Sequence, residues 1–409
     1  MSLQHRIAIV GLTGLLLGAG FGLPGQAQTA PDLADLNRAI RNDPGNAEAY
    51  NSRGVVWFGR RDYDKAIADF DVAIRLTPGD ARAYNNRGNA YAEQWRLAEA
   101  IADYDRAIEL SQKAAAPYLN RGIAKRRAGN LAAAQADLAQ AARLDPKNAN
   151  AHNELGLMQQ SREAYTEAIA SFGKAIRLAP KWATAYNNRG NAWSDKGHRQ
   201  RALRDFNQAI RLDQRYALAY YNRGLNWRRQ GALDRALHDF DQALRLDPEL
   251  TAAYNNRGLI YEEKGEPDRA LSDFERAIRL DPNFARAYNN RGNVWRAKRQ
   301  FDRAVADFNK AAELDPKDAL ARLNLATAQQ GAGRLREAMT DIGQALALDP
   351  KSAIAHFTRG QILEKLGERA KAVADYRKAI ALDPAYPEPA EALKRLEGQG
   401  TPSRLRRRS

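Results

Sequence analysis

The 409 residues contain no cysteine, and this absence removes several kinds of chemistry at once. Without a thiol there can be no disulfide bond, no thiolate nucleophile and no lipid anchor attached to cysteine. Cysteine usage therefore neither supports nor opposes export from the cell.

Histidine is scarce, and its five copies do not form a site: His5, His152, His198, His238 and His356. A zinc or iron centre needs three or four converging ligands, and no histidine has paired ligands at a suitable spacing. The sequence also lacks a glycine-rich phosphate loop and a nucleophile elbow. We expect a protein with no catalytic residue, no metal and no cofactor.

Long apolar runs are absent except near the N-terminus. The uncharged stretch 7–23 follows His5 and Arg6, and Pro24 separates it from the small residues at 25–27. This pattern predicts a secretory signal peptide, residues 1–27, cleaved after Ala27. The alternative is an uncleaved anchor, but the run falls short of the roughly 20 apolar residues that span a bilayer. We expect an exported protein, periplasmic or secreted, with no membrane span after cleavage.

An internal repeat of 34 residues fills most of the remaining chain. The stretch Thr251–Phe284 matches itself after shifts of 34 residues, and we number positions from Thr251 as position 1. One proline lattice marks this register, with Gln112 and Gln214 in its two gaps: Pro44, Pro78, Pro146, Pro180, Pro248, Pro282, Pro316, Pro350 and Pro384. A period of this length indicates stacked supersecondary units.

Each unit is predicted to be a hairpin of two helices. Tyr254, Gly258 and Tyr261 have the spacing of one helical face, and the segment 265–267 interrupts it with glycine and proline. A second apolar face then begins at Ala270 and ends before Pro282. The fold class predicted from this pattern is all-α.

The order of aromatic, glycine, aromatic, alanine, aromatic and proline residues in this unit resembles the tetratricopeptide repeat (TPR) family, in particular exported bacterial members. The resemblance implies a right-handed superhelical solenoid of ten helix-turn-helix repeats over residues 47–386. Residues 28–46 resemble a half-repeat that caps the N-terminal end, and 387–398 resemble a capping helix, which opposes self-stacking through that end. Residues 399–409 form a basic tail that we expect to be disordered. The oligomeric state is left open.

Small and large residues alternate at fixed positions. Positions 20 and 27 are alanine in all ten repeats, and position 8 is glycine in nine, with Ala326 as the exception. Position 24 is large, as in Phe274. We expect the small residues to let two helices approach and the large one to fill the space between them.

A charged pair recurs sixteen residues apart. Arginine at position 7 coincides with aspartate at position 23 in eight repeats, as in Arg53 with Asp69 and Arg257 with Asp273. One repeat has lost both residues and carries Leu155 and Ser171, and another has Leu325 with Asp341. We interpret these positions as an ion pair within each repeat.

The resemblance places binding on the inner face of the first helices, at positions 2, 5, 6, 9, 12 and 13. Position 6 is asparagine in seven repeats: Asn86, Asn120, Asn188, Asn222, Asn256, Asn290 and Asn324. An amide can donate to and accept from one peptide unit of an extended chain. This row resembles the asparagine ladder in the TPR superhelix of protein O-GlcNAc transferase, without its catalytic domain, and implies peptide binding; a purely structural role is the alternative.

The charge of the chain raises a second hypothesis. Lysine and arginine exceed aspartate and glutamate by 64 to 49, which suggests a polyanion such as nucleic acid or an anionic envelope component. Cations on the inner face include Arg126, Arg127, Arg228, Arg229 and Arg296, but acidic residues on the same face nearly balance them. Position 5 also lacks the lysine that a carboxylate clamp requires. We therefore favour a scaffold for protein or peptide partners over nucleic-acid binding.

Overall fold

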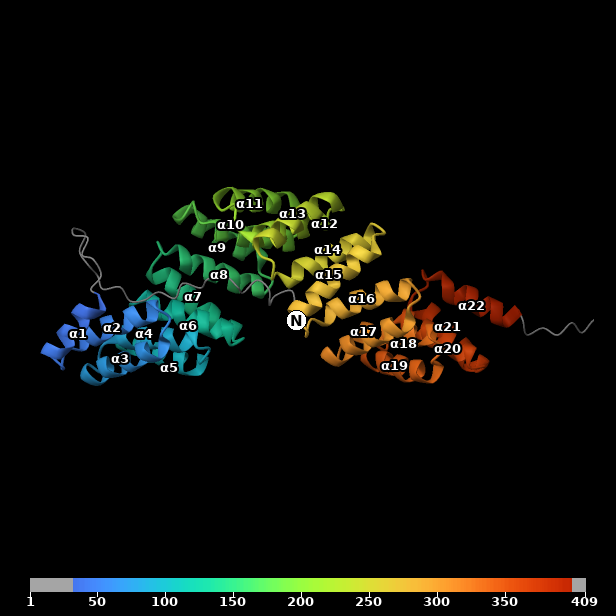
Figure 1. Cartoon of the computed structure of the whole chain (residues 1–409), viewed down its shortest axis with the longest axis horizontal. Coiled ribbons are helices and arrows are strands. Elements are labelled where there is room, and N and C mark those ends of the chain that lie inside the picture. Colours follow the sequence, from blue (N-terminus) through green and yellow to red (C-terminus); the bar gives the residue numbers. More distant parts are fainter. Residues whose placement is uncertain (1–31, 399–409) are drawn as a thin grey trace, which may run out of the picture. The chain divides into compact units, whose positions relative to one another are not determined.

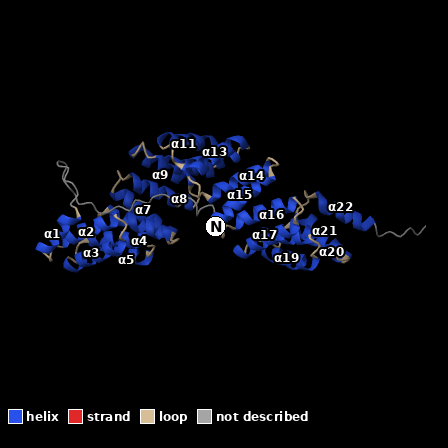
Figure 2. Cartoon of the chain, in the orientation of Figure 1, coloured by secondary structure: helices blue, strands red, loops and turns tan. Residues whose placement is uncertain are grey.

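The computed structural model describes residues 32–398, which form helices joined by short turns and contain no strand (Figures 1 and 2). The prediction of an all-α solenoid of helix hairpins is confirmed. The chain divides into two compact units, of which unit 1 ends at Asn226 and unit 2 begins at Trp227. The predicted signal peptide and basic tail lie outside the described residues. Among the helices of residues 32–398, none is both long and apolar enough to cross a bilayer.

The helices of unit 1 are α1 (Leu33–Asn42), α2 (Ala47–Gly59), α3 (Tyr63–Leu76), α4 (Ala81–Glu93), α5 (Leu97–Leu110), α6 (Ala115–Arg127), α7 (Leu131–Leu144), α8 (Ala149–Ser161), α9 (Tyr165–Leu178), α10 (Ala183–Asp195) and α11 (Arg199–Leu212). The boundary between the units falls within α12 (Ala217–Arg228).

The helices of unit 2 are α13 (Leu233–Leu246), α14 (Thr251–Glu263), α15 (Pro267–Leu280), α16 (Ala285–Ala297), α17 (Phe301–Leu314), α18 (Ala319–Gly331), α19 (Leu335–Leu348), α20 (Ala353–Lys365), α21 (Arg369–Leu382) and α22 (Pro387–Gly398).

The helices pack in sequence order within each unit. We call the even-numbered helices α2 to α20 the first helices and the odd-numbered helices α3 to α21 the second helices. A first helix packs on the second helix that follows it, as α14 does on α15, and this second helix packs on the next first helix, as α15 does on α16 (Figure 1). The helix α1 packs on α2, and α22 packs on α21.

The turn inside each hairpin requires a residue with positive φ at position 15. Glycine supplies it in several repeats, including Gly265 with φ of 73°, because glycine has no Cβ to clash in the left-handed region. Four other residues adopt the same conformation: Arg61, Trp95, Glu163 and Arg299. The turn geometry is therefore retained even where the side chain disfavours it.

The core of each hairpin is a close contact between glycine at position 8 and the large side chain at position 24. A Cβ on Gly258 would lie 2.7 Å from the ring of Phe274, which is fully buried. Where Ala326 replaces the glycine, position 24 is the smaller Ile342. The expectation that small residues permit close helix approach is confirmed.

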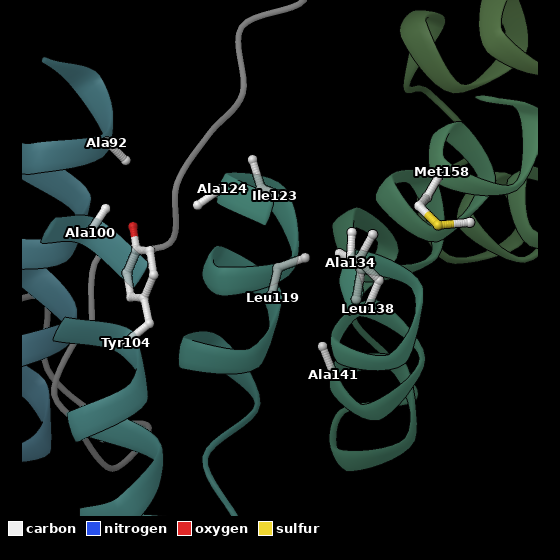
Figure 3. Close-up of a cluster of buried hydrophobic side chains, with 11 residues drawn as sticks. Ala92, Ala100, Tyr104, Leu119, Ile123, Ala124, Ala134, Leu138, Ala141 and Met158 are labelled. Carbon is white, nitrogen blue, oxygen red and sulfur yellow. The ribbon is translucent and has the colours of Figure 1, made fainter. Parts of the chain in front are cut away.

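Buried side chains of neighbouring hairpins also pack against one another. One cluster in unit 1 joins Tyr104 of α5, Leu119 of α6, Leu138 of α7 and Met158 of α8 (Figure 3). Burial of this kind follows from stacking, since each repeat alone would leave one apolar face in water.

Candidate functional site on the first helices

Side chains of successive first helices meet on one face, which we call the first-helix face. The guanidinium of Arg82 on α4 lies 2.6 Å from the carboxylate of Glu48 on α2. A side-chain amide makes a similar contact between two other first helices, since Nε2 of Gln160 on α8 donates to Asp195 on α10 at 2.8 Å. Side chains of consecutive first helices in unit 1 therefore contact one another along this face.

The position-6 asparagines form a ladder with asparagines at position 5 of the preceding repeat. Their Nδ2 groups donate to Oδ1 acceptors at 2.8–3.1 Å in six pairs: Asn86–Asn51, Asn120–Asn85, Asn188–Asn153, Asn222–Asn187, Asn290–Asn255 and Asn324–Asn289. In the seventh case, Asn256 donates to the carbonyl of Ala252 and accepts a bond from Arg228. These amides therefore hold neighbouring repeats together.

Burial divides this row into two groups. Asn86 and Asn120 have no exposed surface, and Asn188 and Asn324 are also buried. A ligand does not reach a buried amide without a rearrangement, so the structure favours a structural role for these four. The half-buried members are Asn222, Asn256 and Asn290. For these three, binding of a peptide stays a prediction.

The sequence interpretation missed the position-5 asparagines, although the sequence carries a signal for them. Wherever position 5 is asparagine, the residue 35 positions later is also asparagine, as with Asn255 and Asn290. After Leu119 the ladder is lost, because Glu154 takes the next position 6. Such a correlation between two positions indicates a contact between repeats, because asparagines that only faced a ligand would not require an asparagine at position 5 of the preceding repeat.

Glu154 instead forms a buried ion pair with Arg126. Nη2 of Arg126 lies 2.8 Å from Oε2 of Glu154, and the two side chains are 8% and 4% exposed. Burying two charges is favourable only when they are well paired. Arg126 therefore stabilises the junction of α6 and α8 and adds little positive potential to the surface.

Most of the other predicted groove arginines also contact the scaffold. Arg228 lies 2.6 Å from Glu263, and Arg296 donates to Asn293 at 3.2 Å. Arg127 donates to the carbonyl of Ala92 at 3.3 Å. The contact with Glu263 neutralises the charge of Arg228, whereas Arg296 and Arg127 donate to uncharged acceptors.

Arg229 is exposed and directly follows the last residue of α12. On α14, burial raises the pKa of Glu262, and the adjacent Glu263 raises it further, while Arg296 and Arg228 lower it. The local field on this part of the face is therefore mixed in sign.

The structure also brings together the residues of the predicted ion pairs. Nη2 of Arg53 lies 2.7 Å from Oδ1 of Asp69, and Arg257 binds Asp273 through Nε and Nη2 at 2.8 and 2.7 Å. Burial raises the pKa of Asp273, and the hydrogen bonds from Arg257 oppose this rise. The pair is thus a bidentate contact with a substantial desolvation cost.

Sequence reasoning missed a third member of this contact. The Nη1 group of Arg257 lies 2.6 Å from Asp241 at position 25 of the preceding second helix, and Arg87 binds Asp71 in the same way. The guanidinium also lies over the ring of Tyr254 at position 4. One arginine therefore links the two helices of its hairpin to the hairpin before it.

The two departures from the pairing rule have local explanations. Asp341, which has no arginine at position 7, binds Arg322 at 3.0 Å and Gln329 at 2.9 Å. Ser171, in the repeat that has lost both charges, donates to Gln159 at 2.8 Å. A polar group thus satisfies the buried position in both cases.

The histidines of the first helices have contacts of the same structural kind. His152 contacts the carbonyl of Pro146 at 3.0 Å, and His356 lies 3.0 Å from Asp375. Residues 32–398 contain no group of three or more acidic or histidine side chains arranged to hold a metal ion.

Stacked helix hairpins define an α-helical repeat protein of the solenoid class. The chain matches the tetratricopeptide repeat family over residues 33–81, 81–113, 119–183, 183–216, 217–250, 251–284, 285–318 and 323–387. These segments cover most of the sequence, so the chain belongs to the TPR family. Such repeats form protein-interaction scaffolds and are typically non-catalytic.

Similar solved structures include the hetero-tetramer Cut9–Hcn1 of the APC/C, which is 15% identical with a TM-score of 0.52 and covers 89% of this chain and 92% of that chain. This likeness shows the fold. YrrB, described as a TPR protein with an unusual peptide-binding site, is 27% identical over 45% of this chain and 95% of its own, with a TM-score of 0.36. A TPR protein from Parabacteroides merdae is 22% identical over 61% and 98%, with a TM-score of 0.46. No curated protein matches the chain.

Proposed function

We propose that the protein is an exported scaffold that binds extended segments of partner proteins along its first-helix face. The observation that supports this proposal most directly is the state of Asn290. One N–H of its Nδ2 group donates a hydrogen bond to Oδ1 of Asn255, and the side chain is only half-buried. A second N–H and the carbonyl oxygen can then bond to the main chain of a ligand.

The charges of the face support a polypeptide partner more than a polyanion. A groove for nucleic acid needs a continuous basic track and stacked bases, with affinity that falls steeply as salt rises. Here Arg126, Arg228 and Arg82 each contact a carboxylate of the same face. Their positive charge is neutralised within the protein.

The proposal is tested with a permanently unfolded polypeptide. The probe is fluorescein-labelled α-lactalbumin, reduced and blocked with iodoacetamide, and binding is measured by fluorescence anisotropy at low and at physiological salt. We expect the chain to bind this probe with a weak dependence on salt. Absence of binding, combined with tight binding of heparin or DNA, would refute the scaffold proposal.

Variants of the ladder separate ligand contacts from structural contacts. The variant Asn222→Ala with Asn290→Ala should weaken probe binding by about tenfold or less for each lost hydrogen bond. Its matched control, Asn86→Ala with Asn120→Ala, removes buried ladder amides and should lower thermal stability more than affinity. If the two folded variants bind the probe as wild type does, the asparagines have no ligand role.

Export is the second part of the proposal. It rests on the apolar stretch 7–23 and the small residues before Gln28. We expect N-terminal sequencing of the exported protein to start at Gln28. Recovery of intact Met1 in a membrane fraction would favour the uncleaved anchor instead.

A further inference from the structure

Position 2 of the last three first helices carries an unusual combination of side chains. On α16 this residue is Arg286, on α18 it is Leu320 and on α20 it is Ile354. Leu320 and Ile354 are 56% and 55% exposed, and Arg286 is also exposed. We call these three residues the position-2 strip.

The equivalent residues of unit 1 show that position-2 side chains of consecutive first helices touch. Arg82 on α4 lies 2.6 Å from Glu48 on α2 and 3.1 Å from Asp80, the residue that caps α4. Because the repeats have equal length, Leu320 and Ile354 stand in the same relation as Glu48 and Arg82.

Arg286 lacks both of the carboxylates that neutralise Arg82. The residue equivalent to Asp80 is Phe284, and the residue equivalent to Glu48 is Ala252. No ion pair joins Arg286 to any carboxylate within residues 32–398. The strip therefore presents an uncompensated cation in line with two exposed aliphatic side chains.

This arrangement extends the proposed function, on which the following inference rests. We propose that the position-2 strip selects partner segments that carry a carboxylate and two large apolar side chains. The carboxylate binds Arg286, and the apolar side chains cover Leu320 and Ile354.

The spacing of these groups in the partner follows from helix geometry. Packed helices lie roughly 8–10 Å apart, and an extended chain advances about 3.3 Å per residue. The three groups should therefore recur about every third residue, as in Glu-x-x-Leu-x-x-Leu or the same series in reverse.

Charge argues against the terminal segments of the chain as occupants. Residues 1–31 and 399–409 contain no aspartate and no glutamate, so neither segment supplies a carboxylate side chain to Arg286. A membrane surface is also a poor fit, because stable attachment to lipid needs several cations or more apolar area than two side chains provide. A segment of another protein satisfies both parts of the strip.

The test uses fluorescein-labelled peptides with the series Glu-Ser-Ser-Leu-Ser-Ser-Leu and its reverse. We expect one order to bind the wild-type chain with a dissociation constant of roughly 10–100 µM. The variant Leu320→Asn with Ile354→Asn should weaken this binding by at least about tenfold. Both residues are exposed, and circular dichroism checks that the helices persist.

Removal of its positive charge tests Arg286 separately. Arg286→Gln should weaken binding of the glutamate peptide severalfold and leave a peptide with glutamine in its place unchanged. Arg82→Gln is the matched control and should change neither. Equal loss for both peptides would contradict a carboxylate on Arg286.

The outcomes distinguish this inference from the proposed function. If unfolded α-lactalbumin binds but neither peptide order does, or if the Leu320 and Ile354 variant binds as wild type does, the inference is wrong and the scaffold proposal stands. Absence of binding to every polypeptide refutes both. If the same variant instead abolishes vesicle flotation, or converts a dimer to a monomer in sedimentation, the occupant is lipid or a second copy and the inference is wrong.

Discussion

The hairpins α8–α9 in unit 1 and α14–α15 in unit 2 are two copies of the same repeat, but different side chains connect their two helices. Both have glycine at position 8 against a buried phenylalanine at position 24. Only α14–α15 has the charged pair, Arg257 with Asp273. In α8–α9 these positions hold Leu155 and Ser171. The steric contact is therefore common to both hairpins, while the ion pair is replaceable.

The replacement is physically reasonable because a buried ion pair adds little net stability. Desolvation offsets most of the attraction between Arg257 and Asp273, whereas the removal of one partner leaves a buried charge alone. The combination of Leu155 and Ser171 has neither the desolvation cost of two charges nor an unpaired buried charge. The hydroxyl of Ser171 is satisfied because it donates to Gln159. The two hairpins further differ at position 15, where Glu163 replaces Gly265, and at position 12, where Gln160 replaces Glu262.

The largest effect is expected from a half-exchange of the charged pair. Arg257→Leu should lower the free energy of unfolding by about 3–5 kcal/mol, because Asp273 is left buried without its partner. Arg257→Leu with Asp273→Ser, which copies α8–α9, should lose only roughly 0–2 kcal/mol. Chemical denaturation followed by circular dichroism measures both.

The control for this exchange is an exposed arginine of the same hairpin. Arg279 lies 3.9 Å from Glu275 at the surface, so Arg279→Ala should change stability by about 0–1 kcal/mol. A double variant as unstable as the single one would show that the pair itself, and not an uncompensated charge, stabilises the hairpin.

The shared steric contact should be equally sensitive in both hairpins. A Cβ added at Gly156 or at Gly258 would lie 2.7 Å from the ring at position 24. Gly156→Ala and Gly258→Ala should each lower stability by about 1–3 kcal/mol, the usual range for overpacking. Thermal melts check this, and clearly unequal losses would mean that one ring has room to move.

Exchange at position 15 should act in opposite directions. Glu163 has φ of 62°, where a Cβ is unfavourable, so Glu163→Gly should raise stability by about 0.5–1 kcal/mol. Gly265→Glu should lower it by about 1–2 kcal/mol. Denaturation midpoints measure both variants, and a loss of stability in Glu163→Gly would show that the side chain makes a compensating contact.

The smallest effect depends on pH. Burial raises the pKa of Glu262 in the folded chain, so its ionised form is disfavoured by folding above that pKa. Glu262→Gln should therefore raise stability at pH 7 by less than about 1 kcal/mol, since the group is half exposed. The gain should disappear as pH falls through the folded pKa to about 4.3, the value of an unfolded glutamate.

The reverse exchange is the matched control. Gln160 donates to Asp195, so Gln160→Glu would place two carboxylates together and should lower stability at neutral pH. A gain for Glu262→Gln that persists in acid would mean that side-chain size, and not charge, is responsible.

Contacts within one repeat could be predicted from the sequence, because their partners recur at a fixed separation. Arg257 and Asp273 are 16 residues apart, as are Arg53 and Asp69, and the loss of both charges at Leu155 and Ser171 indicates the same pairing. Asp241 also lies 16 residues from Arg257, but it was missed because position 25 has no regular residue type: its equivalents include Ala139, Gly173 and Gly343, so no recurring pair marks the contact.

By itself the sequence determined the hairpin, its period and the glycine-to-phenylalanine contact, since these follow from helical spacing and side-chain size. Only the tertiary structure decided which polar groups face solvent. Asn86 and Asn290 occupy the same position of the repeat, yet one is buried and the other is half-buried. Likewise, Arg82 is neutralised and Arg286 is not, because Asp80 and Glu48 lie beside the first while Phe284 and Ala252 replace them beside the second. Exposure and compensation depend on neighbours from adjoining repeats, so the residue type at one position does not specify them.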